Sequence, residues 1–314
     1  MKDTRSRSEA VLARVDEHYA GKPAGKPAGK PAGRLDAGLT DRLRDAFQAA
    51  GCDVERLSLD EIAGIDQLHL GGRAASRRLS QLAQLPAGSR VLDIGCGTGG
   101  ASRLLAAEGD CQVVGIDVTA EFIDVARWLS RATGLSSRTR FICADAAELP
   151  LPSASVDAVW CQHALLNMPT PDAVIGEWCR VLAGQGKLLL HEVVSGDNPS
   201  PLVLPVPWAS RREHSQLESL AQLERRLKSA GFECLTLEDV TADALAWRGK
   251  HARHEQPPQA ETTQGTPAKT EGSRHKLPGA AAIFGESFVD MGRNLLDNLQ
   301  HDRVRVVQGV WQRG

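Results

Sequence analysis

Apolar residues along this 314-residue chain follow two different spacings. From position 89 onward, short apolar runs alternate with stretches in which apolar residues recur every three or four positions, as in strands alternating with amphipathic helices. This alternation predicts an α/β fold, a doubly wound parallel sheet covered by helices on both faces. The expected strands are Arg90–Ile94, Gln112–Ile116, Arg140–Ala144, Val156–Cys161 and Lys187–Val194. The expected helices between them are Gly100–Glu108, Ala120–Ala132 and Pro171–Leu182.

The segments outside this alternation divide the chain further. Residues 21–38 contain three Gly-Lys-Pro-Ala repeats, and proline at every fourth position excludes a helix, so a flexible linker is expected there. Residues 251–277 are polar and non-periodic, which predicts a disordered insertion. The remaining expected parts are a helix within residues 1–20, a core with a helical cap over 39–250, and a final helix and strand over 278–314. Within the core we also expect helices at Asp41–Ala50 and Leu217–Ala230, and a strand at Glu233–Glu238.

Composition narrows the class of protein. The 37 Lys and Arg against 39 Asp and Glu give a net charge of −2, and aromatic residues make up 4%. Nucleic-acid binders need a basic excess, so no nucleic acid is expected as a partner. No apolar run approaches the length of a membrane span, and the charged N-terminus resembles no signal peptide. The seven cysteines lack CxxC spacing, which favours reduced thiols in the cytoplasm.

A glycine-rich turn follows the first expected strand. Gly95, Gly97 and Gly100 satisfy GxGxxG between a strand and a helix, and Asp117 stands twenty residues after Gly97. This spacing alone also fits an NAD-binding turn. Asp93 favours S-adenosylmethionine (SAM) instead, because a carboxylate there would repel a pyrophosphate but can accept hydrogen bonds from an ammonium group.

The motifs VLDIGCGTG, GID, the ADA after the third strand and VDAVWCQH…RVLAGQGKLLLHEV resemble those of class I SAM-dependent methyltransferases, of the methyltransferase type 11 kind. The resemblance spans about residues 60–245, and the tail from 280 to 314 fits the family's terminal helix and strand. It implies a seven-stranded Rossmann-like sheet and SAM as cofactor. It also implies that Gly95 and Gly97 pass close to the methionine part of SAM, that Asp117 binds the ribose hydroxyls, and that Asp145 and Ala146 bind the adenine. Further cofactor contacts are expected at Gln67, Arg73, Asp93, Val118 and Gln162.

Candidates for the acceptor pocket lie in two places. His163 and Gln162 follow the fourth strand, where open parallel sheets bind ligands, and are the candidate catalytic residues; Trp160 stands beside them. His69 lies in the cap and, with His163, is a candidate for the acceptor side. His163 could equally be a polar strand end, and His69 a surface histidine. No metal site is expected, because the histidines do not cluster with acids along the chain.

The segment DQLHLGGR, together with GTGGASRLLA and WCQH, is also similar to sarcosine/dimethylglycine and tocopherol-type small-molecule methyltransferases. The leading hypothesis is N-methylation of a small amino acid or amine. The alternatives are O-, C- or S-methylation of a quinone-like or natural-product acceptor and, more remotely, an NAD(P)-binding oxidoreductase. We expect a small-molecule substrate and no membrane partner, and the assembly that we consider is a homodimer.

Overall fold

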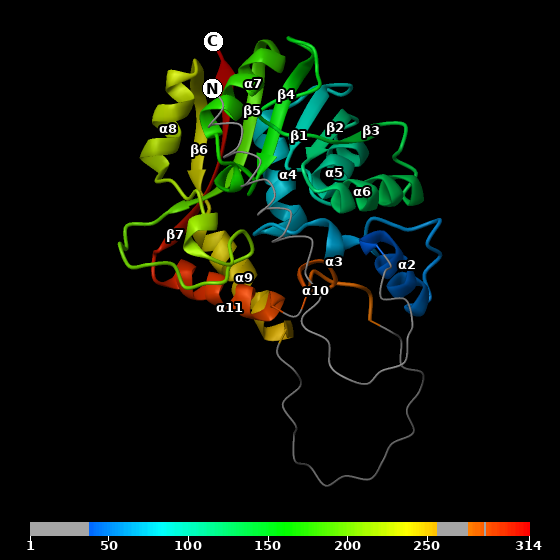
Figure 1. Ribbon diagram of the computed structural model, residues 1–314. Helices are drawn as coiled ribbons and strands as arrows, with labels where there is room; N and C mark the ends of the chain where they lie inside the picture. The colour runs from blue at the N-terminus through cyan, green and yellow to red at the C-terminus, as the bar shows by residue number, and fades with distance from the viewer. Residues whose placement is uncertain (1–37, 256–275, 286) are drawn as a thin grey trace, which may run out of the picture.

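Seven strands form one mixed sheet in the order β3-β2-β1-β4-β5-β7-β6 (Figure 1). The computed structural model describes residues 38–255, 276–285 and 287–314. β7 pairs antiparallel with both β5 and β6, and the pairings from β3 to β5 are all parallel. The strands are β1 (Arg90–Ile94), β2 (Gln112–Asp117), β3 (Thr139–Cys143), β4 (Val156–Gln162), β5 (Leu182–Ser195), β6 (Phe232–Asp239) and β7 (Val304–Arg313).

Helices cover both faces of this sheet and cap one end of it. The α-helices are α2 (Leu39–Ala49), α3 (Ala63–Asp66), α4 (Gly72–Ala83), α5 (Gly100–Glu108), α6 (Ala120–Ala132), α7 (Pro171–Val181), α8 (Leu220–Ser229), α9 (Thr241–Glu255), α10 (Ala281–Phe284) and α11 (Phe288–Gln300). Two 3-10 turns, Leu165–Asn167 and Arg212–His214, complete the description. No helix among the described residues is both long and apolar enough to cross a membrane.

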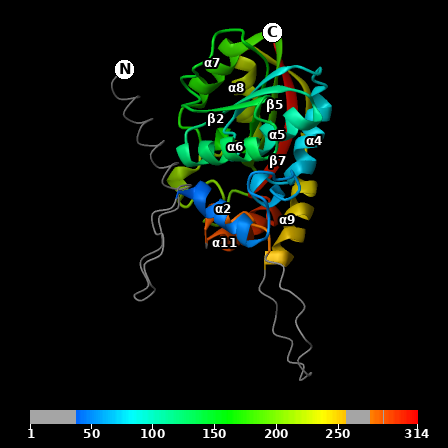
Figure 2. The ribbon, with the colours of Figure 1, turned by 90° about the vertical axis from the view of Figure 1, so that its right-hand side faces the viewer.

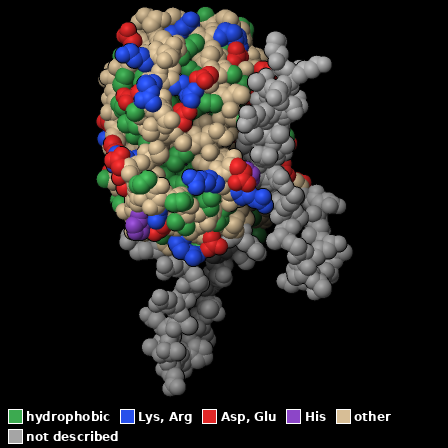
Figure 3. All heavy atoms as spheres, turned by 60° about the vertical axis from the view of Figure 1, so that its left-hand side comes forward, with side chains coloured by type: hydrophobic (Ala, Val, Ile, Leu, Met, Phe, Trp, Pro, Cys, Tyr) green, Lys and Arg blue, Asp and Glu red, His purple; other side chains and the backbone are tan. Residues whose placement is uncertain are grey.

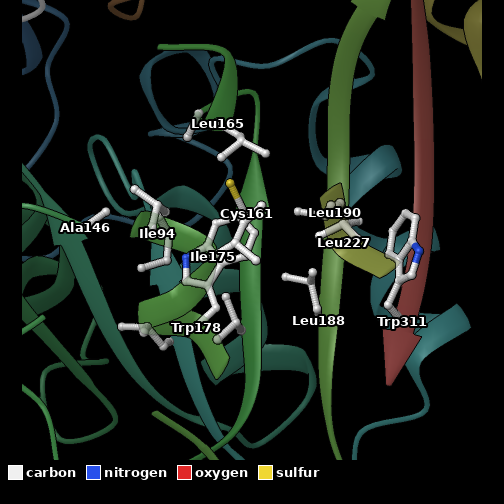
Figure 4. Close-up of a cluster of buried hydrophobic side chains, with 14 of the residues drawn as sticks. Ile94, Ala146, Cys161, Leu165, Ile175, Trp178, Leu188, Leu190, Leu227 and Trp311 are labelled. Carbon is white, nitrogen blue, oxygen red and sulfur yellow. The ribbon is translucent and has the colours of Figure 1, made fainter. Parts of the chain in front are cut away.

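The largest apolar cluster lies between the sheet and helices α7 and α8. Figure 4 shows Trp178 of α7 and Leu227 of α8 near side chains of β4, β5 and β7. A second cluster joins α4 and α5 to the opposite face, where Trp160 is fully buried. Because helices bury both faces of the central strands, the sequences of these strands are continuous apolar runs without polar alternation.

The crevice of the fold lies where the strand order reverses. β1 has β2 on one side and β4 on the other, so the connection after β1 leads one way along the sheet and the connection after β4 leads the opposite way. In doubly wound sheets, ligands bind outside the carboxyl ends of the strands at such a point. The helices α2, α3, α10 and α11 lie together beyond this end of the sheet (Figures 1 and 2). Figure 3 shows one face of the molecule, on which acidic and basic side chains are interspersed.

The predicted doubly wound α/β fold with a helical cap is confirmed, with two differences in its elements. β5 begins at Leu182 rather than Lys187, because its early residues pair with β4 across a bulge. α9 runs through residues 251–255, where the sequence predicts the start of a disordered insertion. The Arg248 side chain of α9 is buried and donates to the Gly292 carbonyl oxygen. Because a polar residue takes an inward-facing position, the apolar spacing that would predict this helix from the sequence is interrupted.

The predicted helices Asp41–Ala50 and Leu217–Ala230, the strand Glu233–Glu238 and the final helix and strand correspond to α2, α8, β6, α11 and β7. Three further predictions fall wholly or largely outside the described part of the chain. The expected helix within residues 1–20 and the Gly-Lys-Pro-Ala linker both precede residue 38, and residues 256–275 of the expected insertion are likewise not described.

Candidate functional site

A cavity opens at the carboxyl ends of β1, β2 and β4. Its empty volume is about 1330 Å³, counted out to its open mouth. Apart from Arg73 and Trp160, every residue predicted for the site lines it: Gln67, His69, Asp93, Gly95, Gly97, Asp117, Val118, Asp145, Ala146, Gln162 and His163. Residues far apart along the chain therefore meet in one place, as the strand-end argument requires.

The glycine turn forms the floor of this cavity. A Cβ atom on Gly95 would come within 2.4 Å of the Ala164 Cβ, and the φ angle of Gly95 is +66°. Gly97 also has a positive φ, of +53°, but a Cβ there would meet nothing within 4 Å. Gly95 is therefore needed for close packing as well as for backbone conformation, whereas Gly97 is needed for conformation and leaves open space above the turn.

Asp117 joins the glycine turn to the end of β2. Its Oδ2 accepts a hydrogen bond from the Gly97 N–H at 2.9 Å, and its Oδ1 accepts one from the Thr119 N–H at 2.9 Å. Each carboxylate oxygen has a second lone pair, so both can also accept a hydroxyl hydrogen from a ligand. The predicted ribose role and a structural role for this carboxylate are therefore compatible.

Asp93 lies deeper in the cavity, at the end of β1. Its side chain is almost fully buried, and its Oδ2 accepts a hydrogen bond from the Ser102 hydroxyl at 2.6 Å. Burial raises the pKa of Asp93 to about 7, which the Ser102 hydrogen bond partly opposes. A cationic ligand group beside this carboxylate would lower its pKa again, because an opposite charge favours the ionised form.

Asp145 and Ala146 line the side of the cavity that follows β3. The Asp145 Oδ1 accepts the Ala147 N–H at 2.9 Å, which closes a tight turn around this carboxylate. Together with Asp93 and Asp117, this places three acids around the glycine turn, each from the end of a different strand.

Two predicted residues lie elsewhere. Arg73 binds the Asp60 carboxylate at 2.8 Å and the Leu59 carbonyl oxygen, within the cap, and does not line the cavity. Trp160 points into the core between the sheet and α4, because alternate residues of β4 face opposite sides of the sheet. Its indole N–H reaches back to the Gln162 Oε1 at 3.0 Å. Trp160 therefore positions Gln162 and does not form a wall of the pocket.

Three histidines meet beside Gln162. The ring centroids of His69, His163 and His191 lie 5.0–6.0 Å from one another. The Nε2 atoms of His163 and His191 are buried and have no hydrogen-bond partner among the described residues. A buried polar atom without a partner is uncommon in folded proteins and calls for an explanation such as a ligand or an unseen water.

All three imidazoles are held in the neutral form. Burial lowers the pKa of His69 to about 4 and that of His191 to about 3. Burial, then the neighbouring His191 and His69, lowers the pKa of His163 well below its usual value. The backbone of His163 has a φ of +49°, uncommon for a residue with a side chain, and its N–H donates to the His191 carbonyl oxygen at 2.8 Å.

Ser76 of α4 and His191 of β5 are polar residues beside the histidines that the sequence argument missed, as it did the apolar residues of the cavity wall. The Ser76 Oγ lies 2.9 Å from the His69 Nε2, and its hydroxyl is within reach of the Gln67 and Gln162 Oε1 atoms at 3.2 and 3.1 Å. A signal for His191 existed, since β5 must lie beside β4 and the register places it next to Gln162. No comparable signal marked Ser76, whose position depends on how α4 packs.

Away from the acids, Gln162 and the histidines, the lining of the cavity is mainly apolar. Asn167 and Thr170 are among the few polar residues there. Among the described residues, no lysine or arginine lines the cavity, and no group of three or more His, Cys, Asp or Glu could hold a metal ion. The apolar wall is formed by Leu68, Met168, Pro169, Val174, Pro207, Trp208 and Phe284.

Comparison with known proteins agrees with this geometry. Residues 92–190 match the family model described as a methyltransferase domain. The chain is 30% identical over 181 residues to the methyltransferase GfsG of Streptomyces halstedii, covering 57% of this chain and 65% of that protein. It is 35% identical over 168 residues to the 27-O-demethylrifamycin SV methyltransferase of Amycolatopsis mediterranei, covering 52% and 61%. The chain thus spans about three fifths of the length of these curated relatives.

Among solved structures, the [4+2]-cyclase SpnF superposes with a TM-score of 0.59 at 26% identity, over 88% of this chain and 93% of that one. The matched domain contains most of β1 and of β5, the glycine turn, Asp117 and Asp145, so the family model covers the part of the chain that builds the cavity floor. Residues 92–190 thus match a methyltransferase domain, and with its seven-stranded sheet and the acids at three strand ends the chain is similar to class I SAM-dependent methyltransferases.

Proposed function

We propose that this chain transfers the methyl group of SAM to a hydroxyl oxygen of a small, mainly apolar acceptor. The observation that carries the proposal is the His163 Nε2, a buried nitrogen at the cavity that has no hydrogen-bond partner among the described residues. A neutral imidazole with an unused ring nitrogen is suited to accept a proton from a bound hydroxyl group.

The residues of the inner cavity fit SAM. When bound, SAM supplies an activated methyl group on a positively charged sulfur. The open space above Gly97 allows a ligand to approach the backbone of the turn. The Asp117 carboxylate has acceptor capacity for ribose hydroxyls, and Asp93 offers a carboxylate to the ammonium group. Asp145 and Ala146 lie on the side where the adenine would bind.

The histidines then determine which acceptors can react. A hydroxyl must lose its proton as its oxygen takes the methyl group, whereas an unprotonated amine needs no base. The lowered pKa of His163 keeps its imidazole unprotonated at neutral pH, so its lone pair is available. The same shift makes the imidazole a weak base, so the proton must move as the oxygen–methyl bond forms and not before it. The proton of the hydroxyl would pass to the His163 Nε2 while the oxygen forms its bond to the methyl carbon, and the electron pair of the broken sulfur–methyl bond would stay on the sulfur of the leaving S-adenosylhomocysteine.

The lining of the outer cavity supports a neutral, apolar acceptor. Its wall includes Trp208, Met168 and Phe284, and no lysine or arginine among the described residues is placed there to bind a phosphate or carboxylate. The relative that methylates a 27-O-demethylrifamycin is named for transfer to oxygen, while other matched relatives are named as C- and N-methyltransferases. N-methylation of a small amine stays a prediction that the same assay tests.

The experiment is a methyl-transfer assay with radiolabelled SAM. The acceptor panel would contain neutral phenols and hydroxylated macrolactones, quinols, sarcosine and dimethylglycine. His163→Ala should lower kcat about 10²- to 10⁴-fold, the usual contribution of a general base, and leave the SAM dissociation constant within about twofold. His301→Ala, at an exposed histidine of the α11 terminus, is the matched control and should behave as the unmodified protein.

Several outcomes would overturn the proposal. Turnover of sarcosine or dimethylglycine alone, unaffected by His163→Ala, would favour the amine hypothesis. Binding of NAD rather than SAM in calorimetry would exclude the cofactor. Because SpnF is named as a cyclase, the products should also be weighed by mass spectrometry: conversion of an acceptor without gain of a methyl group would contradict methyl transfer.

A further inference from the structure

Arg103 of α5 is a fully buried cation directly beneath the glycine turn. Its guanidinium donates hydrogen bonds to the Asp66 carboxylate and the Thr98 carbonyl oxygen. It also donates to the Ala126 carbonyl oxygen at 3.1 Å and to the Ser130 hydroxyl at 3.2 Å. One side chain therefore ties together the end of α3, the glycine turn and α6.

The backbone of the cap lies against the turn at the same place. The Thr98 hydroxyl donates to the Ile65 carbonyl oxygen at 2.8 Å. A Cβ atom on Gly100 would lie only 1.7 Å from the Asp66 carbonyl oxygen. Gly100 is thus the residue that allows the cap to rest on the first turn of α5, and any side chain there would push the cap away.

The residues directly after this contact form a wall of the cavity. Asp66, Gln67, Leu68 and His69 all line it. Leaving the Arg103 guanidinium without its carboxylate partner would be unfavourable, because a buried charge needs compensation. The ion pair therefore fixes where this wall stands relative to the floor formed by the glycine turn.

We propose that Asp66 and Arg103 are positioning residues that hold residues 65–69 over the glycine turn and so slow the release of the bound adenosyl cofactor. Neither residue takes part in methyl transfer. The inference concerns the cofactor side of the proposed function and is independent of which acceptor atom is methylated. It is tested with S-adenosylhomocysteine, which needs no turnover.

The test measures the dissociation rate of S-adenosylhomocysteine by stopped-flow displacement. Asp66→Asn keeps the size of the side chain and removes its charge, and Gly100→Ala displaces the cap without altering any charge. Both should speed dissociation at least about tenfold, since each separates the cap from the turn by a different route. The control is Leu227→Ala, which removes packing in α8, away from the cap, so that a general loss of stability can be told apart.

Three results would overturn the inference. The first is a dissociation rate within twofold of the unmodified protein in both cap variants, and the second is an equally large increase of the dissociation rate in Leu227→Ala at a similar loss of thermal stability. The third is amide hydrogen exchange in residues 65–69 that does not change when the cofactor product binds. The last measurement uses the unmodified protein and so does not depend on a variant that folds. Saturating S-adenosylhomocysteine should slow amide exchange in residues 65–69, while exchange in α8 should stay the same. Absence of any S-adenosylhomocysteine binding would instead refute the proposed function.

Discussion

Replacing Asp117 with alanine removes the one carboxylate that both shapes the glycine turn and faces the expected ribose site. Two backbone N–H groups, those of Gly97 and Thr119, lose acceptors that lie at 2.9 Å. Hydrogen bonds to a charged group contribute about 1.5–3 kcal/mol each, and part of the loss is recovered by water. We expect the free energy of S-adenosylhomocysteine binding to weaken by about 1–3 kcal/mol, roughly 5- to 150-fold in Kd.

Calorimetry measures this change, and a second ligand pair isolates the ribose contact. Adenosine and 2′,3′-dideoxyadenosine differ only in the ribose hydroxyls, so the unmodified protein should prefer adenosine and Asp117→Ala should lose most of that preference. Asp124→Ala removes an exposed carboxylate of α6 and serves as the control. A Kd for Asp117→Ala within twofold of the unmodified value, or an intact preference for adenosine, would refute the ribose role.

Two further predictions follow from the cavity. Gly95→Ala should lower both the thermal midpoint and cofactor affinity more than Gly97→Ala, because its Cβ would meet the Ala164 Cβ at 2.4 Å, whereas at Gly97 the cost is that of a positive φ, about 1–2 kcal/mol. Equal effects in thermal melts and calorimetry would contradict the packing argument. His69 has its pKa lowered from 6.5 to about 4 on folding, so the unfolded chain binds more protons between these values and stability is lost as the pH falls through them. His69→Gln should therefore remove up to about 3 kcal/mol of this pH dependence in denaturant titrations between pH 6.5 and 4. Glu192, whose pKa burial raises to about 8, acts in the opposite direction as the pH rises, so the difference between variant and unmodified protein is the quantity to compare. An unchanged slope would show that His69 is not buried in the neutral form.

The sheet was predictable because its strands are apolar on both faces. β1 and α5 have the predicted bounds, β2 and β4 differ by one residue at one end, and β3 is shifted by one residue at both ends. α9 was not predictable in the same way, since a buried arginine replaces the apolar residue that would complete its helical pattern. Sequence spacing predicts which apolar side chains are buried, but it does not predict the burial of a polar side chain whose hydrogen-bond partner lies on another helix.

The residues of the site likewise fall into those that local sequence predicts and those that depend on tertiary packing. Gly95, Gly97 and Asp117 occupy positions that a strand-turn-helix connection dictates, and the cavity contains all three. Arg73 has a partner, Asp60, that is reached only once the cap is folded, and this partner takes it away from the cavity. Ser76 joins the site through the packing of α4 against β5 and β7, which no spacing along the chain encodes.

The sequence by itself determined the doubly wound sheet, the glycine turn and the acids at the strand ends, because strand periodicity and turn chemistry are local properties of the chain. Only the tertiary structure decided that His69, His163 and His191 meet, that burial keeps them neutral, and that the cap rests on Gly100 through Asp66 and Arg103. These features depend on distances between segments far apart along the chain and on the exclusion of water from between them. Such distances and such exclusion exist only after the cap has packed against the sheet.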